Sequence, residues 1–275
     1  MSDVTVEVLQ TGSVGVDKAV PDRSVSSNNL AFTGLFRSRK NRILLPVKCF
    51  LITALNGQKI LVDTGWDSKI RDHPIRTITY PMWFASKPIL PPGQAIDELL
   101  YQRSLQPEDL AMVIMTHLDI DHDSGLRLVK KAPAIYATKE EQLALHSLDL
   151  RYVRKPCRGI SFKTIVWNGT EGPFGKSWDV FNDNSVVVLF TPGHSRGSLS
   201  IKVQAKDDFV LIVGDSGYNA HSWDSLAMPG PVASKEDLKT TLSWIAAQRK
   251  DPHCRKVLCA HDTDPTTGPQ ILTLE

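Results

Sequence analysis

The strongest chemical signal in the chain is a run of metal-capable side chains at residues 117–123 (HLDIDHD), directly after the apolar run Ala111–Met115. Histidine or aspartate fills five of these seven positions, and the other two are Leu118 and Ile120. At the end of a buried strand, alternate residues of this run would point to one side. Imidazole and carboxylate are the usual protein ligands of zinc, iron and manganese. The run therefore predicts a metal site rather than a solvated acidic loop.

The same run has the carboxylate spacing of a calcium-binding loop, with Asp119, Asp121 and Asp123 at alternate positions. An EF-hand loop that began at Asp119 would need glycine at its sixth position and glutamate at its twelfth. Those positions hold Ser124 and Lys130, so the calcium interpretation is rejected.

Three further polar residues directly follow apolar runs that are typical of strands. His194 stands in TPGH after VVVLF, Asp215 in GDSG after FVLIV, and His261 in AHD after KVLC. Any one of them alone is typical of a capped or hydrogen-bonded structural residue. Four strands that all deliver histidine or aspartate at equivalent ends are hard to explain by packing, so we expect them to form one site.

A competing hydrolase motif overlaps one of these segments. Residues 193–197 (GHSRG) match the G-x-S-x-G elbow of α/β-hydrolases, and Ser195, Asp215 and His261 follow in the chain order of that triad. An elbow leads from a strand into a helix, whereas Ser198–Val203 alternates like another strand. The elbow also leaves the metal-capable run without a role, so a serine hydrolase is disfavoured.

The elements that must position these residues are short strands in two groups, with helices after each group. The predicted strands are Val4–Leu9, Leu44–Ala54, Lys59–Val62, Ala111–Met115, Ser185–Phe190, Leu199–Val203, Phe209–Val213 and Lys256–Cys259. Asn56-Gly57 predicts a tight hairpin between the second and third. Helices are predicted at 94–104, at 138–148 with a Thr138/Glu141 capping box, and at 234–248 with Ser234 as N-cap. The pattern predicts a layered α/β architecture with two sheets.

Length and composition limit the function classes. The 275 residues contain 41% hydrophobic and 23% charged residues and carry a net charge of +2, which is typical of a globular protein and gives no reason to expect a nucleic-acid partner. The basic run Arg37–Arg42 is interpreted as a solvated loop. No apolar run reaches the ~18 residues of a membrane span, no secretory signal opens the chain, and four cysteines are too few for a disulfide scaffold. We expect a cytoplasmic protein with no membrane partner.

Residues 66–93 resist assignment to helices or strands. They are rich in aromatic residues and proline, which predicts a lid or a hydrophobic plug inserted beside a substrate pocket. The chain shows no internal repeat and no long linker. We therefore expect one domain over residues 1–275, with two similar αβ halves.

The order of the motifs resembles the metallo-β-lactamase superfamily over nearly the whole chain, from Val4 to His261. The matching motifs are DTG at 63–65, THLDIDH at 116–122, PGH at 192–194, GD at 214–215 and AHD at 260–262. The chain is most similar to N-acyl homoserine lactonase-type hydrolases, through Pro107–Leu110, Tyr218 and a short tail after His261. The resemblance implies a mixed α/β (α+β) fold, a four-layer αββα sandwich with metal ions at one edge between the two sheets.

The resemblance also implies two divalent metal ions per chain, zinc being the usual metal of the family. The implied ligands of the first ion are His117, Asp119 and His194. Those of the second ion are Asp121, His122 and His261. Asp215 would bridge the ions together with a hydroxide, and Asp63 would orient a ligand histidine.

Asp119 departs from the family pattern, which usually has a second histidine there. Three carboxylates and one hydroxide bring the charge around two divalent ions to about zero, where the usual histidine leaves about +1. We expect the lower charge to raise the pKa of the bound water and to favour iron or manganese over zinc. Flavodiiron proteins of the same superfamily carry glutamate at this place, so a non-heme iron redox protein is an alternative, although no flavodoxin-like segment follows.

The expected reaction is hydrolysis of a small lactone or ester, in which the bridging hydroxide attacks the carbonyl. Tyr218 would hydrogen-bond the substrate carbonyl, and Asp121 would protonate the leaving alkoxide. Residues 66–93 and 218–230 would wall an apolar pocket. The alternative is a glyoxalase-type thioesterase or a phosphodiesterase, which would require a basic residue such as Arg196 near the metals. We expect a small-molecule substrate and a monomer or homodimer.

Overall fold

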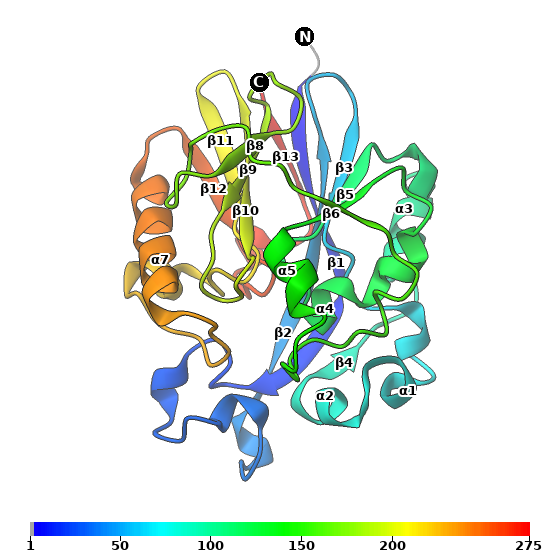
Figure 1. Cartoon of the computed structure of the whole chain (residues 1–275), viewed down its shortest axis with the longest axis vertical. Coiled ribbons are helices and arrows are strands. Elements are labelled where there is room, and N and C mark those ends of the chain that lie inside the picture. Colours follow the sequence, from blue (N-terminus) through cyan, green and yellow to red (C-terminus); the bar gives the residue numbers. More distant parts are fainter. Residues whose placement is uncertain (1–2) are drawn as a thin grey trace.

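The computed structural model describes residues 3–275, in which two β-sheets lie face to face between layers of helices (Figure 1). Within these residues the first sheet has eight strands, in the order β13-β1-β2-β3-β5-β6-β7 with β4 paired to β1. The second has five, in the order β12-β11-β10-β9-β8. The predicted αββα sandwich is confirmed.

The strands of the first sheet are β1 (Val4–Asp17), β2 (Arg42–Thr53), β3 (Lys59–Val62), β4 (Lys87–Ile89), β5 (Met112–Ile114), β6 (Ile135–Ala137), β7 (Phe162–Thr164) and β13 (Ile271–Leu274). Those of the second are β8 (Ser177–Asp179), β9 (Val186–Phe190), β10 (Leu199–Ala205), β11 (Asp208–Ile212) and β12 (Cys254–Leu258). The α-helices are α1 (Pro74–Ile78), α2 (Tyr80–Ala85), α3 (Ile96–Tyr101), α4 (Ile120–Asp123), α5 (Lys139–Ala144), α6 (Ala220–Asp224) and α7 (Lys235–Lys250). Short 3-10 helices span Arg23–Val25, Ala31–Thr33, Arg39–Asn41, Ser68–Ile70, Pro107–Asp109, Ser124–Val129 and Pro265–Thr267.

Alternating apolar residues build the core between the two sheets. Val6 pairs with Ile52 and Val8 with Phe50, and all four side chains are buried in this core. On the outer faces, α7 packs Leu238, Leu242 and Ile245 against the second sheet, and α3 packs Ile96 and Leu100 against the first. The shared core fixes the edge at which the strand ends meet.

The predicted elements agree with the structure at most places. The Asn56-Gly57 hairpin pairs Thr53 with Lys59, and Ser234 Oγ accepts a hydrogen bond from Asp237 N at 3.2 Å to begin α7. The Thr138/Glu141 box is half formed. Thr138 Oγ1 accepts from Glu141 N at 3.3 Å, but the Glu141 carboxylate faces the site described below.

The first strand was expected to end at Leu9, yet β1 continues to Asp17. A β-bulge between Gln10 and Ser13 shifts the register, after which residues 13–17 still pair with β2 and residues 13–15 also pair with β4. Gly12 has a φ of +77° there, and a Cβ at this position would lie 2.2 Å from Ile89 O. Only glycine fits both conditions.

The segment 66–93 contains α1, α2 and β4, none of which was predicted. Trp66 is fully buried, while Tyr80 and Phe84 of α2 are exposed. Among residues 3–275, no helix is long and apolar enough to cross a membrane. All four cysteines are unpaired.

Candidate metal and active site

The strand ends bring the predicted residues to one edge of the sandwich. β3 and β5 run parallel in the first sheet, and β11 and β12 run parallel in the second, so their carboxyl ends point the same way. His117 follows β5, Asp119 is the N-cap of α4, and α4 carries Asp121 and His122. His194, Asp215 and His261 follow β9, β11 and β12. The structure brings together all seven predicted ligands: His117, Asp119, Asp121, His122, His194, Asp215 and His261.

The ligand atoms form two groups whose spacing fits metal coordination. In the first group, Asp119 Oδ2 lies 3.5 Å from His117 Nε2 and 3.3 Å from His194 Nε2. In the second, His261 Nε2 lies 3.4 Å from Asp121 Oδ2. Ligands bound tetrahedrally at the usual zinc distances would be about 3.4 Å apart. These separations exceed good hydrogen bonds, but they match atoms that share a cation.

Asp215 lies between the two groups with one oxygen toward each. Its Oδ1 is 3.3 Å from His122 Nε2 and 3.4 Å from His261 Nε2, while its Oδ2 is 3.6 Å from His194 Nε2. Ligand atoms of His117, His194 and Asp215 lie within 4.8 Å of one another, and so do those of Asp121, His122 and His261. The carboxylate is therefore placed to bridge two cations.

Four buried atoms of these seven residues lack a hydrogen-bond partner within residues 3–275: His117 Nε2, His122 Nε2, His194 Nδ1 and Asp215 Oδ1. Buried polar atoms without a partner cost free energy, and a cluster of them among potential metal ligands indicates a cation site. The residues present therefore fit the metal ions that the fold family implies.

Hydrogen bonds to the other ring nitrogens hold three of the four imidazoles in place. His122 Nδ1 contacts Asp63 Oδ2 at 2.8 Å, His117 Nδ1 contacts Thr116 Oγ1 at 3.0 Å, and His261 Nδ1 contacts Pro46 O at 2.7 Å. An imidazole that donates from Nδ1 presents the lone pair of Nε2 to a metal. These contacts turn each Nε2 into the site.

Asp63 accepts three hydrogen bonds around these imidazoles through its carboxylate. It is fully buried, with a φ of +59°, and besides His122 its carboxylate accepts from Thr116 N and Thr116 Oγ1, both at 2.7 Å. Its left-handed backbone conformation is uncommon for a residue other than glycine, and here it aims the carboxylate across β5 toward the metal ligands.

We expect Asp63→Asn to lower metal affinity by about 10- to 100-fold, because the amide cannot accept from all three donors and leaves His122 misoriented. Equilibrium dialysis against a competing chelator measures the affinity. The control is Asp67→Asn, since Asp67 is also buried but pairs with Arg127 at 2.7 Å, outside the site. Equal losses in both variants would contradict the role given to Asp63.

Electrostatic interactions between the buried carboxylates and imidazoles shift the pKa values of the ligand residues. Burial penalises the charged form of His122, but the Asp215 and Asp63 carboxylates outweigh it and raise the pKa of His122 well above its usual value. Burial likewise opposes ionisation of Asp215, yet the histidines His261 and His122 hold its pKa well below the usual range. A metal ion needs the neutral imidazole, so loading the site releases protons.

Arg151 is a residue of this site that the sequence did not reveal. Its guanidinium forms a bidentate pair with Asp119, with Nε–Oδ1 at 2.5 Å and Nη2–Oδ2 at 2.6 Å. Nη1 donates to His194 O at 2.5 Å, and Nη2 also contacts His194 Nε2. Burial and the Arg151 charge act in opposite directions on Asp119, and the net effect keeps the pKa of Asp119 well below its usual value.

This ion pair changes the charge count expected from the sequence. Asp119 adds one negative charge relative to the usual histidine, and Arg151 supplies one positive charge at contact distance. The centre thus regains the charge that the substitution removes. The charge argument for iron or manganese is weakened, while the preference of those metals for a carboxylate oxygen is unaffected.

Glu141 joins the loops that carry the ligands. Its Oε2 accepts from Leu118 N at 2.9 Å, and its Oε1 accepts from Ser195 Oγ at 2.6 Å and Gly197 N at 2.9 Å. Ser195 is fully buried and donates to this carboxylate, and the chain continues into β10 rather than a helix. Ser195 is a structural residue, which removes the geometric basis for a serine nucleophile.

The ligands form the floor of a cavity of about 1330 Å³. Asp121, Asp215, His261 and Tyr218 line its floor. Its apolar walls come from α2, as expected for 66–93, and from two segments that were not expected, residues 23–35 and 143–152. Of the loop 218–230, only Tyr218 and Gly230 contribute.

Tyr218 is buried at the metal end of this cavity. Its ring stacks on His261 with centroids 5.4 Å apart and an interplanar angle of 17°. Within residues 3–275, no protein atom hydrogen-bonds its hydroxyl. Burial, reinforced by Asp215, raises the pKa of Tyr218 well above its usual value, so the group stays a neutral phenol.

The sequence profile of the metallo-beta-lactamase superfamily matches residues 42–254. The chain belongs to the metallo-beta-lactamase superfamily. The chain is a hydrolase, because its relatives in the superfamily are named as lactonases and metallo-hydrolases.

Three relatives illustrate the similarity. The N-acyl homoserine lactonase AttM of Rhizobium radiobacter is 26% identical over 227 residues, covering 80% of this chain and 83% of its own. The N-acyl homoserine lactonase of Bacillus cereus is 29% identical over 191 residues, covering 67% and 69%. A probable metallo-hydrolase of Mycobacterium tuberculosis is 26% identical over 245 residues, covering 78% and 74%.

Solved structures agree on the fold. An N-acyl homoserine lactone hydrolase with N-hexanoyl-L-homoserine bound at its catalytic metal centre superposes with a TM-score of 0.77 at 20% identity, covering 97% of this chain and 96% of its own. The dizinc quorum-quenching lactonase AidC gives a TM-score of 0.64 at 14% identity, covering 95% and 88%.

Proposed function

We propose that the chain is a dinuclear metallohydrolase that opens a small lactone or ester, of the N-acyl homoserine lactone class. One observation carries the proposal: Asp215 directs one oxygen to each of two ligand groups at the floor of an apolar cavity. The names of the lactonase relatives support the substrate class.

The proposed ligands of the first ion are His117, Asp119 and His194. Those of the second are Asp121, His122 and His261, with Asp215 shared. When bound, two divalent ions supply Lewis acidity toward a carbonyl and a water that is nucleophilic at neutral pH. We take zinc as the metal, with iron or manganese as the alternatives that the Asp119 carboxylate favours.

The chain's own residues bind the substrate and handle the proton. The apolar walls receive an acyl chain, so the polar ester group is directed to the floor, where the acidic and imidazole side chains are. The Tyr218 hydroxyl donates to the carbonyl oxygen as negative charge develops on it. Asp121 holds the proton of the attacking water at its carboxylate and delivers it to the leaving alkoxide, which is too basic to depart alone.

Tyr218→Phe is expected to lower kcat by about 10²-fold, the scale of losing one donor to a developing oxyanion. Metal content should stay unchanged, because the hydroxyl contacts no ligand. The variant removes one oxygen atom and keeps the stacking on His261, so it isolates the hydrogen bond. An unchanged kcat would remove Tyr218 from the reaction.

A phosphodiesterase is the second candidate, and the positions of the arginines that line the cavity argue against it. Arg151 lies in the cavity but its guanidinium is committed to Asp119 and His194 O, and Arg196 is exposed at the wall. A phosphodiester would meet no free guanidinium beside the ligand groups. This arrangement favours a neutral ester or lactone.

The experiment measures ring opening of N-acyl homoserine lactones, monitored through the release of protons, with and without chelator. We expect hydrolysis that chelator abolishes and added metal restores. A thioester, a bis-aryl phosphate and oxygen consumption serve as parallel assays for the thioesterase, phosphodiesterase and iron redox alternatives. Activity on one of those with none on lactones would overturn the proposed substrate. We further propose that the protein is cytoplasmic, which the four unpaired cysteines support, and that it is a monomer or homodimer.

A further inference from the structure

Exposed apolar side chains surround the mouth of the cavity. Of the large hydrophobic residues that are exposed, six also line the cavity: Leu30, Leu35, Tyr80, Phe84, Leu143 and Leu150. They come from three separate parts of the chain, the stretch after β1, helix α2, and α5 with the loop that follows it. Scattered exposed leucines are ordinary, but a ring of them around one opening marks an interaction surface.

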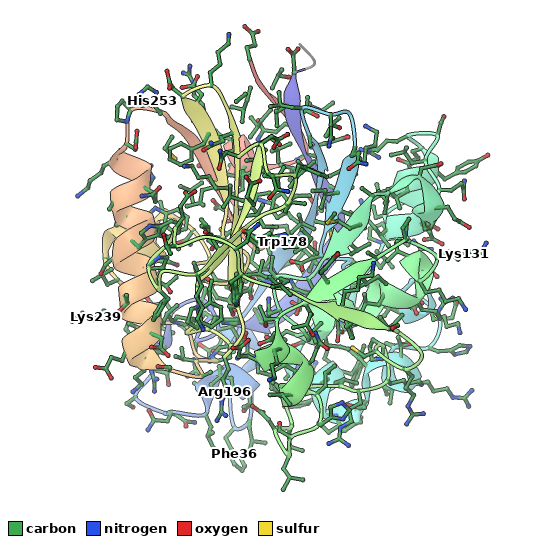
Figure 2. All side chains as sticks on the ribbon, turned by 45° about the horizontal axis from the view of Figure 1, so that its top comes forward. Phe36, Lys131, Trp178, Arg196, Lys239 and His253 are labelled. Carbon is green, nitrogen blue, oxygen red and sulfur yellow. The ribbon has the colours of Figure 1, made fainter. Side chains whose placement is uncertain are left out.

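Two of the most exposed apolar residues adjoin members of this ring along the chain. Phe36 is 94% exposed beside Leu35, and Leu148 is 94% exposed beside Leu150. The segments that carry these residues lie at the lower end in Figure 1, and Figure 2 shows Phe36 with Arg196 at the end away from His253. Neither Phe36 nor Leu148 lines the cavity. Their exposure is therefore not explained by the substrate pocket.

The same three parts of the chain carry an excess of positive charge. Residues 18–44 hold six basic residues against one acidic, residues 69–87 hold four against one, and residues 139–158 hold five against three. These segments together carry +10, so the rest of the chain carries −8 of the total +2. Three of the basic residues pair with acids outside the segments, namely Arg37 with Asp17, Arg71 with Glu98 and Arg151 with Asp119. A net charge of +7 remains on these segments.

We propose that this face, defined by Leu30, Leu35, Phe36, Leu148, Leu150 and the basic residues Arg39 and Lys40, docks on an anionic lipid bilayer. Peripheral membrane proteins bind bilayers through exposed apolar side chains next to unpaired Lys and Arg. The apolar side chains insert at the boundary between headgroups and acyl chains, and the cations contact acidic lipids. The cavity then opens directly onto the membrane surface.

Charge and side-chain chemistry favour a lipid bilayer over a second copy of the chain and over a nucleic acid as the partner of this face. A second copy docked symmetrically on the same face would set two strongly positive surfaces against each other. A nucleic acid would match the charge, but its phosphates offer nothing to aliphatic tips such as Leu148 and Leu150. A lipid surface satisfies both features at once.

This inference departs from the expectation that the chain has no membrane partner, which rested on the lack of an apolar span. A peripheral contact needs no span. The proposed membrane contact does not depend on which ester is hydrolysed, because it is argued from the exposure and charge of residues outside the metal centre. Any amphiphilic substrate dissolved in the bilayer would reach the cavity without crossing bulk water.

The test is co-sedimentation of the intact metal-loaded protein with large vesicles, in the absence of substrate. We expect at least about tenfold stronger binding to vesicles that contain phosphatidylglycerol than to pure phosphatidylcholine, and weaker binding at high salt. Phe36→Ser/Leu148→Ser and Arg39→Glu/Lys40→Glu should each lower binding to anionic vesicles by about tenfold or more.

The matched control variants make the same kinds of substitution elsewhere on the surface. Tyr101→Ser/Ile271→Ser removes two exposed apolar residues, and Lys206→Glu/Lys250→Glu reverses two charges, both away from the cavity walls. Binding in these controls should equal wild type. Three results would overturn the proposal: equal binding to neutral and anionic vesicles, binding to duplex DNA instead of vesicles, or a dimer by light scattering that Phe36→Ser/Leu148→Ser dissociates.

Discussion

Asp215→Ala is expected to lower kcat/KM for lactone hydrolysis by at least about 10³-fold, the scale on which a preorganised electrostatic group contributes to acyl-transfer transition states. The reason is geometric. Among residues 3–275, Asp215 is the carboxylate that faces both ligand groups, with Oδ1 near His122 and His261 and Oδ2 near His194. Without it, two cations close together would lack the shared negative charge that holds them.

The same variant should change metal binding in a specific way. The second group keeps Asp121, His122 and His261, whose atoms remain clustered without Asp215. The first group keeps two histidines and an aspartate that Arg151 already engages. We therefore expect the metal content to fall from about two ions per chain toward one.

Elemental analysis beside the kinetic assay separates loss of metal from loss of fold. Asp208→Ala is the control, because Asp208 begins the strand that leads to Asp215 but pairs with the exposed Arg255. It should keep both metal and activity. An Asp215→Ala variant that retained both would refute the bridging role.

The second large effect concerns the pair formed by Asp119 and Arg151. Both side chains are 15% exposed, so their bidentate contact lies largely out of water. Removing one partner of such a pair leaves an uncompensated charge, and Arg151→Met should lower the free energy of unfolding of the metal-free protein by about 3 kcal/mol. Urea unfolding measures this loss.

A double-mutant cycle shows whether the two residues act together. In Asp119→His/Arg151→Met both charges disappear, so most of the stability should return, with a coupling energy of about 2 kcal/mol. The double variant also exchanges an oxygen ligand for a nitrogen ligand at constant local charge. We expect its bound metal to shift toward zinc when zinc, iron and manganese are offered together.

Arg154→Met is the matched control for this cycle. Arg154 lies three residues from Arg151, is exposed, and donates to Ser147 O at 2.8 Å. It should change neither stability nor metal preference. If the Arg151 and Asp119 substitutions proved additive, the pair would carry no joint function, and the charge compensation described for the centre would be wrong.

The ligand set could be predicted because each member stands at a strand end with a local signature. His194, Asp215 and His261 each follow an uninterrupted apolar run, and parallel strands bring their carboxyl ends to one edge. The burial pattern of residues 4–9, the Asn56-Gly57 turn and the Ser234 cap are equally local, so the sequence was sufficient for them.

Arg151 could not be predicted, since it lies 32 residues beyond Asp119 in a segment without motif or regular structure. Its contact with Asp119 depends on how the chain returns over the site, which no local pattern encodes. The short strands β6, β7 and β8 span three residues each and exist because neighbouring strands pair with them. β13 likewise completes the sheet through long-range pairing with β1.

The direct test of the dinuclear centre is elemental analysis of protein purified without chelator or metal-affinity resin. The arrangement of Asp215 between two ligand groups predicts about two metal ions per chain, and only about one in Asp215→Ala. A wild-type protein that holds no metal after loading with zinc, iron and manganese in turn would contradict the dinuclear hydrolase and leave the buried, unpartnered nitrogens of His117 and His122 unexplained.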